Sequence, residues 1–125
     1  MTHERKKLGS HGEDLAVEFL KRQGYRILQR NFKLKFGEID IVAQEGDTVC
    51  FIEVRTKTGD ELGTPFESIT PFKQRKLSRL ALAYLKNQYK SVEVRARFDV
   101  VAVFSEDGKE EKVEIIKNAF EVYSY

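Results

Sequence analysis

The chain has 125 residues, of which 41% are hydrophobic and 34% charged, a composition typical of one well-solvated domain spanning residues 1–125. No apolar run approaches the roughly 20 residues of a membrane span and no hydrophobic signal region follows Met1, so we expect a cytoplasmic protein with no membrane partner. The single cysteine, Cys50, excludes an internal disulfide. With no Cys/His cluster a zinc site is excluded, and His3 and His11 are interpreted as surface residues.

The net charge of +2 is distributed unevenly along the chain. Residues 1–36 carry +5 (nine basic, four acidic) and 73–97 carry +7 (eight basic, one acidic). Residues 37–72 carry −6 (two basic, eight acidic) and 98–125 carry −4 (three basic, seven acidic). An acidic centre between basic segments suits a metal-dependent enzyme acting on a phosphate backbone, although basic runs are also common as solvated faces.

The first predicted element is a helix over residues 11–23. Ser10 and Glu13 fit a capping box, in which Ser10 caps the helix and Glu13 reaches back to its backbone N–H. Gly24 fits the position that ends the helix. Apolar residues recur at helical spacing: Leu15, Ala16, Phe19 and Leu20.

A strand over 25–34 and a β-hairpin follow. Residues 38–43 and 48–54 are rich in β-branched and aromatic residues, and Gly46-Asp47 fits a two-residue hairpin loop. In that register paired residue numbers sum to 93, so Asp40 lies opposite Glu53. Alternation assigns the other face to the core, which makes Cys50 a buried thiol: Ile39, Ile41, Cys50, Ile52 and Val54.

Residues 56–65 are predicted to form a functional loop, and Thr70-Pro71 then opens a second helix. Its core-facing stripe is Leu77, Leu80, Ala81, Tyr84 and Leu85. The sequence returns to the sheet at 92–94, with strands at 98–104 and 112–116 separated by a turn at 106–108. The order α-β-β-β-α-β-β predicts an α/β fold, a mixed β-sheet flanked by helices.

The predicted chemistry centres on the facing carboxylates of Asp40 and Glu53. Such a pair repels unless something compensates. Arg55 and Lys57 could neutralise both acids in a purely structural ion network. Alternatively the pair binds Mg²⁺ or Mn²⁺, ions that take oxygen ligands from one or two carboxylates, water and substrate phosphate.

Three segments carry a family resemblance: Gly37–Val42, Phe51–Lys57 and Arg97–Val101. Together they resemble the YraN-like family of uncharacterised bacterial proteins, which is similar to the Holliday-junction-resolvase-like branch of the PD-(D/E)XK nuclease superfamily. The resemblance covers nearly the whole chain. It implies a restriction-endonuclease-like fold and a Mg²⁺- or Mn²⁺-dependent endonuclease acting on DNA.

Carried over onto this sequence, the resemblance implies a metal site at Asp40 and Glu53. Glu13 matches an acid that some members add to the metal, and its capping role stays an equal alternative. Arg55 stands where the superfamily has its catalytic lysine, and a guanidinium stays protonated, so Arg55 cannot be a general base. It can still bind the scissile phosphate, and Lys57 is the candidate for the missing ammonium.

Basic residues of the second helix are the predicted grip on DNA: Lys73, Arg75, Lys76 and Arg79. Nothing resembles a base-reading helix, so we expect selection of DNA by shape rather than by sequence. Asp99 lies within an apolar strand and is expected to pair with Arg95, Arg97 or a loop N–H, with a direct metal role as the alternative.

The Arg at the lysine position also supports a second hypothesis. The domain would then be a non-catalytic DNA-binding or partner-docking module that keeps the nuclease fold. Cleavage of a four-way junction would require a symmetric homodimer, which no residue pattern in the sequence specifies. A role as a docking partner at the cell envelope has no positive support in the sequence.

Overall fold

The computed structural model describes residues 2–58, 69–90, 94–105 and 110–120, with side chains described from residue 11 onward except that of Thr58. The elements follow the predicted order α-β-β-β-α-β-β. They are α1 (Thr2–Arg22), β1 (Arg26–Leu34), β2 (Gly37–Glu45), β3 (Thr48–Thr58), α2 (Pro71–Tyr89), β4 (Ala96–Ser105) and β5 (Lys112–Phe120).

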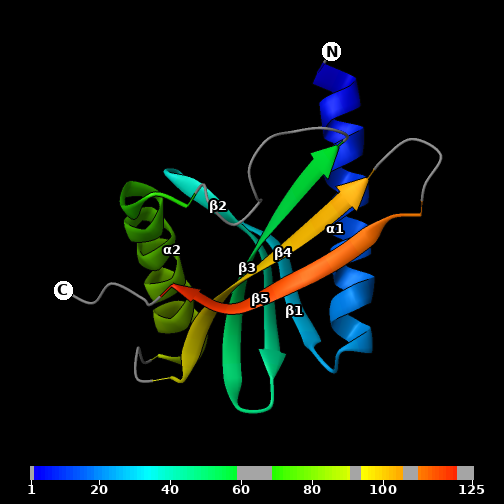
Figure 1. The fold of residues 1–125 in the computed structure, drawn as a ribbon. Helices are drawn as coiled ribbons and strands as arrows, with labels where there is room; N and C mark the ends of the chain where they lie inside the picture. The colour runs from blue at the N-terminus through cyan, green and yellow to red at the C-terminus, as the bar shows by residue number, and fades with distance from the viewer. Residues whose placement is uncertain (1, 59–68, 91–93, 106–109, 121–125) are drawn as a thin grey trace.

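The five strands form one mixed sheet in the order β1-β2-β3-β4-β5 (Figure 1). Neighbouring strands are antiparallel except β3 and β4, which run parallel. A parallel pair needs a crossover connection, and α2 supplies it between β3 and β4. The predicted α/β architecture of a mixed sheet flanked by helices is therefore confirmed.

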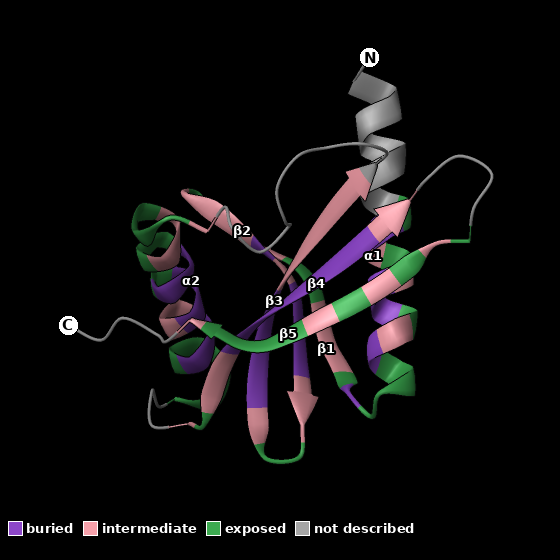
Figure 2. Cartoon of the chain, in the orientation of Figure 1, coloured by how far each residue is buried: buried purple, intermediate pink, exposed green. Residues whose placement is uncertain are grey.

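The two helices pack on opposite faces of the sheet, so the central strands are buried on both sides (Figure 2). The α1 side gathers residues of α1 and the sheet, among them Ala16, Leu20, Ile41, Cys50 and Ile52. The α2 side contains the whole predicted stripe of the second helix, packed on Val42, Phe51 and Phe98. One residue departs from the predicted alternation: Ile39 packs in the α2-side cluster and not beside Ile41.

Helix α1 begins nine residues earlier than its predicted start at residue 11. Ser10 therefore lies inside the helix and is not its N-cap residue, so the predicted capping box is wrong. Residues 4–8 are good helix formers, and they let the helix continue past Ser10 toward the N-terminus. The C-terminal prediction is confirmed, because Gly24 follows the helix with φ +93°, a conformation that glycine adopts freely.

Gly12 marks a close approach between α1 and β3. A Cβ atom at Gly12 would lie 2.4 Å from the Thr56 hydroxyl oxygen, so only glycine fits this contact. Thr56 itself lies in a strand, because β3 continues to Thr58 in parallel pairing with β4. The start of the predicted loop at 56–65 is thus extended strand, and residues 59–65 lie outside the described residues.

Other boundaries shift by a few residues. Strand β4 begins at Ala96, so Val94 precedes it, while residues 92–93 and the predicted turn at 106–108 lie outside the described residues. Strand β5 continues four residues beyond the predicted end at 116. In the described part of the chain no helix is long and apolar enough to cross a membrane.

The predictions for the cysteine and the histidines have separate outcomes. Cys50 is fully buried, and burial raises the pKa of its thiol to about 12, as expected of a core residue. His11 is exposed, with its Nε2 3.1 Å from Glu111 Oε1. The side chain of His3 lies outside the described residues.

Candidate active site

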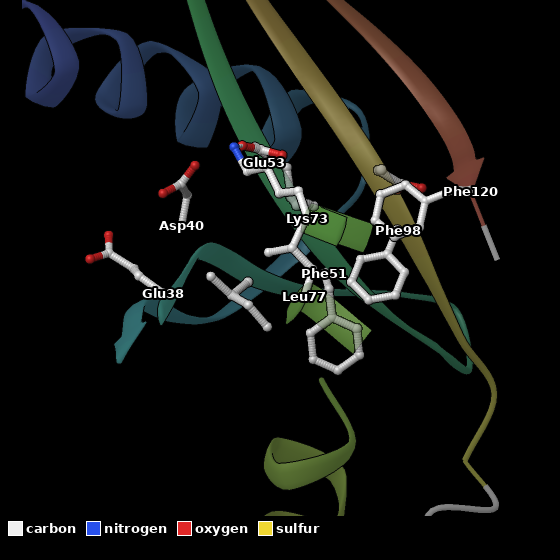
Figure 3. Close-up of a pocket in the computed structure, with 11 residues that line it drawn as sticks. Glu38, Asp40, Phe51, Glu53, Lys73, Leu77, Phe98 and Phe120 are labelled. Carbon is white, nitrogen blue, oxygen red and sulfur yellow. Dashed lines mark hydrogen bonds and ion pairs between the residues drawn. The ribbon is translucent and has the colours of Figure 1, made fainter. Parts of the chain in front are cut away.

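A pocket of about 170 Å³ opens beside the first turn of α2, where β2 and β3 leave their hairpin pairing (Figure 3). It brings together the two carboxylates predicted from the hairpin register, Asp40 and Glu53. Apolar side chains from both strands, α2, β4 and β5 form much of its wall. The lining residues are Glu38, Ile39, Asp40, Phe51, Ile52, Glu53, Lys73, Leu77, Phe98, Asp99 and Phe120.

Asp40 is held at the end of the hairpin ladder. The paired residues run from Glu45 and Thr48 to Ile41 and Ile52, and their numbers sum to 93 as predicted. Asp40 follows directly beyond the last of these pairs. Its Oδ2 accepts a hydrogen bond from the backbone N–H of Val54 at 2.9 Å. The Asp40 side chain therefore connects β2 to β3 at the point where the backbone pairing of the two strands ends.

The Asp40 carboxyl group lies in an environment that disfavours its charge. Its pKa is raised from 3.8 to about 6, mainly by burial. The negative charges of Glu53, Glu13 and Glu38 contribute to this rise, and the hydrogen bond from the Val54 N–H opposes it. A cation placed among these carboxylates would remove the repulsion. A perturbed acid in a pocket is a frequent sign of a functional site.

Glu53 uses its two oxygens differently. Its side chain is only 12% exposed, and its Oε1 contacts both the Lys73 ammonium and Arg55 Nη2, the latter at 3.4 Å. Its Oε2 is buried and has no hydrogen-bond partner. A buried carboxylate oxygen without a partner is costly, which indicates that a further positive ligand belongs at this oxygen.

Lys73 lies in the pocket and not with the other predicted DNA-binding residues. Thr70 caps α2 by accepting the N–H of Lys73 at 3.2 Å, as predicted for the helix start. Lys73 precedes the buried Leu77 by four residues, so it lies on the sheet-facing stripe of α2 and reaches Glu53 (Figure 3). Lys57 is a partly buried residue of β3 that does not line this pocket.

Glu13 lies near enough to Asp40 to raise its pKa, but it does not line the pocket. Its Oε1 accepts from Arg30 Nε at 3.2 Å, and its Oε2 accepts from Asn31 Nδ2 at 3.2 Å. Asn31 also donates to Glu38 Oε1 at 3.0 Å, so it links two of the acids around Asp40. The hydrogen bonds of Glu13 replace the capping role considered from sequence, and its metal role stays a prediction.

Asp99 borders the pocket, but its carboxylate is bonded on the α1 side of the sheet. It is 1% exposed and accepts from Tyr25 Oη at 3.1 Å, Arg97 Nε at 3.0 Å and the N–H of Asn118 at 2.9 Å. The predicted pairing with Arg97 is confirmed, whereas the backbone N–H comes from strand β5 and not from a loop as predicted. Arg95 instead pairs with Asp47, at 3.6 Å. With its oxygens so occupied, Asp99 is a structural residue and not a metal ligand.

The remaining predicted DNA-binding residues do come together on one exposed surface. Arg75, Lys76 and Arg79 line an open hollow of about 570 Å³ with three residues that the sequence prediction missed, Lys35, Phe36 and Phe72. The sequence does contain a pattern that groups Phe72 with these basic residues. Phe72, Arg75, Lys76 and Arg79 follow the spacing i, i+3, i+4 and i+7, which places all four on one helix face.

The donor set of the pocket suits a hard divalent cation that keeps several waters. Among the described residues no group of three His, Cys, Asp or Glu side chains is arranged to hold a metal. Mg²⁺ does not need such a cage, because it is commonly bound through one or two carboxylates and substrate phosphate. Asp40 and the unpartnered Oε2 of Glu53 provide two such oxygens.

Comparison with known proteins gives a consistent result. The family model described as Uncharacterised protein family UPF0102 matches residues 12–103. The UPF0102 protein of Geobacter metallireducens is 47% identical over 123 residues, covering 98% of each chain. That of Caldicellulosiruptor saccharolyticus is 47% identical over 117 residues, covering 93% of this chain and 98% of the relative. That of Chlorobium phaeobacteroides is 48% identical over 118 residues, covering 90% and 93%.

Proposed function

The chain belongs to the UPF0102 family, and from the geometry of its pocket we propose that it is a divalent-metal-dependent endonuclease acting on DNA. One observation carries the proposal. The Oε2 of Glu53 is buried without a partner in the pocket that Asp40 also lines, and the pKa of Asp40 is raised by burial and by neighbouring acids. A cation bound between these groups would compensate both costs.

The resemblance to the PD-(D/E)XK superfamily supports this choice of reaction. Asp40 and Glu53 stand at the positions of that superfamily's metal-binding acids, and Arg55 stands at the position of its lysine. The mixed sheet with a helix on each face agrees with the fold that the resemblance implies. Fold likeness alone is a weak guide to activity, so the argument depends on the acids in the pocket.

Asp40 and Glu53 would hold Mg²⁺ or Mn²⁺, with Glu13 near enough to adjust the charge around them. When bound, such an ion supplies Lewis-acid polarisation of the phosphodiester and a water of lowered pKa. The hydrogen bond from the Val54 N–H fixes the orientation of the Asp40 carboxylate. Asp40 and Glu53 thus offer an anchored pair of oxygen ligands in the pocket.

The cations beside Glu53 have a different role. Lys73 and Arg55 both contact Glu53 Oε1, so they hold this carboxylate in place and bring two positive charges to the pocket. Facing a bound DNA strand, they would bind the scissile phosphate and stabilise the charge that develops on it. In this proposal Lys73, which lines the pocket, is a source of the ammonium in addition to Lys57.

The test is cleavage of labelled four-way junction, flap, single-stranded, linear duplex and supercoiled substrates in Mg²⁺, Mn²⁺ or EDTA. We expect metal-dependent cutting that selects DNA by shape, that EDTA abolishes, and that Glu53→Gln reduces by at least about a hundredfold. Glu114→Gln on the exposed part of β5 is the matched control and should cut normally. Cutting that persists in Glu53→Gln or in EDTA would refute the proposal.

Arg55 favours a second candidate function, a DNA-binding or partner-docking module without catalysis. A guanidinium cannot take a proton from water, so the superfamily's lysine chemistry is altered in this chain. This candidate predicts binding without cutting in every metal, unchanged by EDTA and by Glu53→Gln. Analytical ultracentrifugation of the junction complex would show in the same study whether two copies bind, as junction cleavage requires.

A further inference from the structure

The hollow beside α2 combines exposed aromatic and basic side chains. It is lined by Lys35, Phe36, Phe72, Arg75, Lys76 and Arg79, which are four cations, two aromatic rings and no acid. Phe72 is 70% exposed, the most exposed of the large hydrophobic residues in the described part of the chain. The fold gives no reason for this exposure, since the core-facing stripe of α2 is complete without Phe72.

Phe36 contributes the second ring from the turn between β1 and β2. The guanidinium carbon of Arg79 lies 4.4 Å from the centroid of the Phe36 ring, in a cation–π contact. Phe36 also packs against the α2-side core, so the ring is anchored in the fold. The hollow therefore presents one fixed aromatic residue and one free aromatic residue, both among positive charges.

The hollow lies next to the candidate active site. The turn between β1 and β2 lies beside the first turns of α2, and a Cβ atom at Gly37 would lie 3.2 Å from Lys76 Cε (Figure 1). Glu38, the next residue, lines the pocket that holds Asp40. On α2, Phe72 of the hollow directly precedes Lys73 of the pocket. A strand bound in the hollow would thus lie beside the elements that carry the carboxylates.

We propose that this hollow binds unpaired nucleotides of a DNA strand, with a base stacked on Phe72 and the phosphates held by Lys35, Arg75 and Lys76. Bases offer flat apolar faces and phosphates offer negative charge, which is the combination that the hollow complements. In a duplex the base faces are covered by stacking, so the exposed ring selects single-stranded segments. The inference rests on the proposed function only in identifying the bound strand as the one to be cut.

The experiment measures binding in EDTA, where no cutting occurs. Fluorescence anisotropy compares a labelled oligothymidine strand with a duplex of equal length, for the wild type, Phe72→Ala and Tyr89→Ala. Tyr89 is the matched control, an aromatic residue 40% exposed at the other end of the same helix. We expect Phe72→Ala to weaken single-strand binding about 5- to 100-fold and duplex binding less than twofold, with Tyr89→Ala unchanged.

Charge is tested on the same helix. Lys76→Gln should weaken both DNA forms and lower the salt dependence of binding, whereas Lys86→Gln, an exposed lysine near the helix end, should leave both unchanged. A 2-aminopurine base in the strand should be quenched by the wild type and not by Phe72→Ala. Circular dichroism of each variant shows that the fold is kept.

Three outcomes would overturn the inference: equal single-strand binding by Phe72→Ala and Tyr89→Ala, equal losses for duplex and single strand in Phe72→Ala, or binding to anionic lipid vesicles without binding to DNA. The two proposals fail separately. Single-strand binding that depends on Phe72 without cutting in any metal refutes the endonuclease alone. Metal-dependent cutting of flaps that Phe72→Ala leaves unchanged refutes the stacking site alone.

Discussion

Asp99 on the α1 face of the sheet and the pair of Asp40 and Glu53 on the α2 face differ in the hydrogen-bond donors that surround them. On the α1 side Asp99 accepts three kinds of donor: a hydroxyl, a guanidinium and a backbone N–H. On the α2 side Glu53 and Asp40 line one pocket (Figure 3). Glu53 keeps one buried oxygen without a partner, and the pKa of Asp40 is raised. The α1-side group is therefore compensated by the protein itself, whereas the α2-side pair is compensated only in part, since one oxygen of Glu53 has no partner.

Burial alone does not separate the two groups, since Asp99 is more deeply buried than either pocket acid. What separates them is the number of donors that the fold supplies. The network around Asp99 extends through Arg97 to Glu45, which accepts from Arg97 at 2.7 Å and from Lys117 at 2.9 Å. These hydrogen bonds lower the pKa of Glu45, as expected of a structural ion network.

The largest change in the free energy of unfolding is expected on removal of the Asp99 carboxylate. Asp99→Ala leaves Arg97 and the Tyr25 hydroxyl without their acceptor, so we expect a loss of about 3–5 kcal/mol in the free energy of unfolding. Urea denaturation followed by circular dichroism measures it. Glu114→Ala, at an exposed position of β5, should change stability by no more than about 0.5 kcal/mol. A loss below about 1 kcal/mol for Asp99→Ala would remove the contrast between the groups.

Neutralising Asp40 should raise the free energy of unfolding, whereas removing Asp99 should lower it. The folded-state pKa of Asp40 is about 6 and its ordinary value is 3.8, so the unfolded state loses this proton first as pH rises. Stability conferred by the protonated form is complete below about pH 4 and is lost by about pH 6. In EDTA, Asp40→Asn should therefore be more stable than the wild type by roughly 1–2 kcal/mol at pH 8, discounted for partial solvent screening.

The same comparison at about pH 3 serves as the control, because there the Asp40 carboxyl group is mostly protonated in both the folded and the unfolded state and the gain should nearly disappear. Denaturant titrations at the two pH values measure the difference. An Asp40→Asn protein less stable than the wild type at pH 8 would show that the carboxylate charge stabilises the fold and is not a cost of function.

Metal should stabilise the protein only through the pocket. At a Mn²⁺ concentration ten times the dissociation constant, we expect about 1.4 kcal/mol of added stability, seen as a higher Tm in calorimetry. Asp99→Asn should keep this response, whereas Asp40→Asn and Glu53→Gln should lose it. A wild-type Tm that does not change with Mn²⁺ or Mg²⁺ would argue against the metal site without involving any substrate.

The smallest effect concerns one hydrogen bond of the compensated network. Tyr25→Phe removes the hydroxyl that donates to Asp99 and accepts from Arg97 Nη2 at 2.9 Å. Because Asp99 keeps its other donors, the expected loss in unfolding free energy is about 1 kcal/mol. Tyr89→Phe is the matched exposed control. A loss as large as that of Asp99→Ala would mean that the hydroxyl is essential to the network.

Local pattern predicted much of this fold because the hairpin is set by its two-residue loop. With Gly46-Asp47 at the turn, the register that brings Asp40 near Glu53 follows from counting. The apolar stripe of α2 and the helix end at Gly24 were likewise predictable from spacing. The failures have two causes. The N–H donor of Asn118 reaches Asp99 because of how β4 and β5 meet, which neither strand's own sequence specifies. The start of α1 was missed because local propensities continue the helix past Ser10.

The sheet-facing position of Lys73 on α2 could have been predicted from the sequence but was not. Spacing relative to Leu77 places it on the sheet-facing stripe, yet its charge favoured a surface interpretation. Only the docking of α2 on β3 shows that this stripe ends over Glu53. The charge of Lys73 led to the prediction that it binds phosphate. The geometry of α2 places that charge in the pocket beside Glu53.

The burial of Cys50 has a consequence for measuring how the protein opens. It is the only thiol, and it lies fully buried in β3, the strand that also carries Glu53. A thiol-specific reagent can reach it only when the central sheet opens, so the rate of alkylation under native conditions counts those openings. The alkylation rate of Cys50 therefore reports how often the sheet opens, and it does so on the strand whose stability the candidate ligand would change.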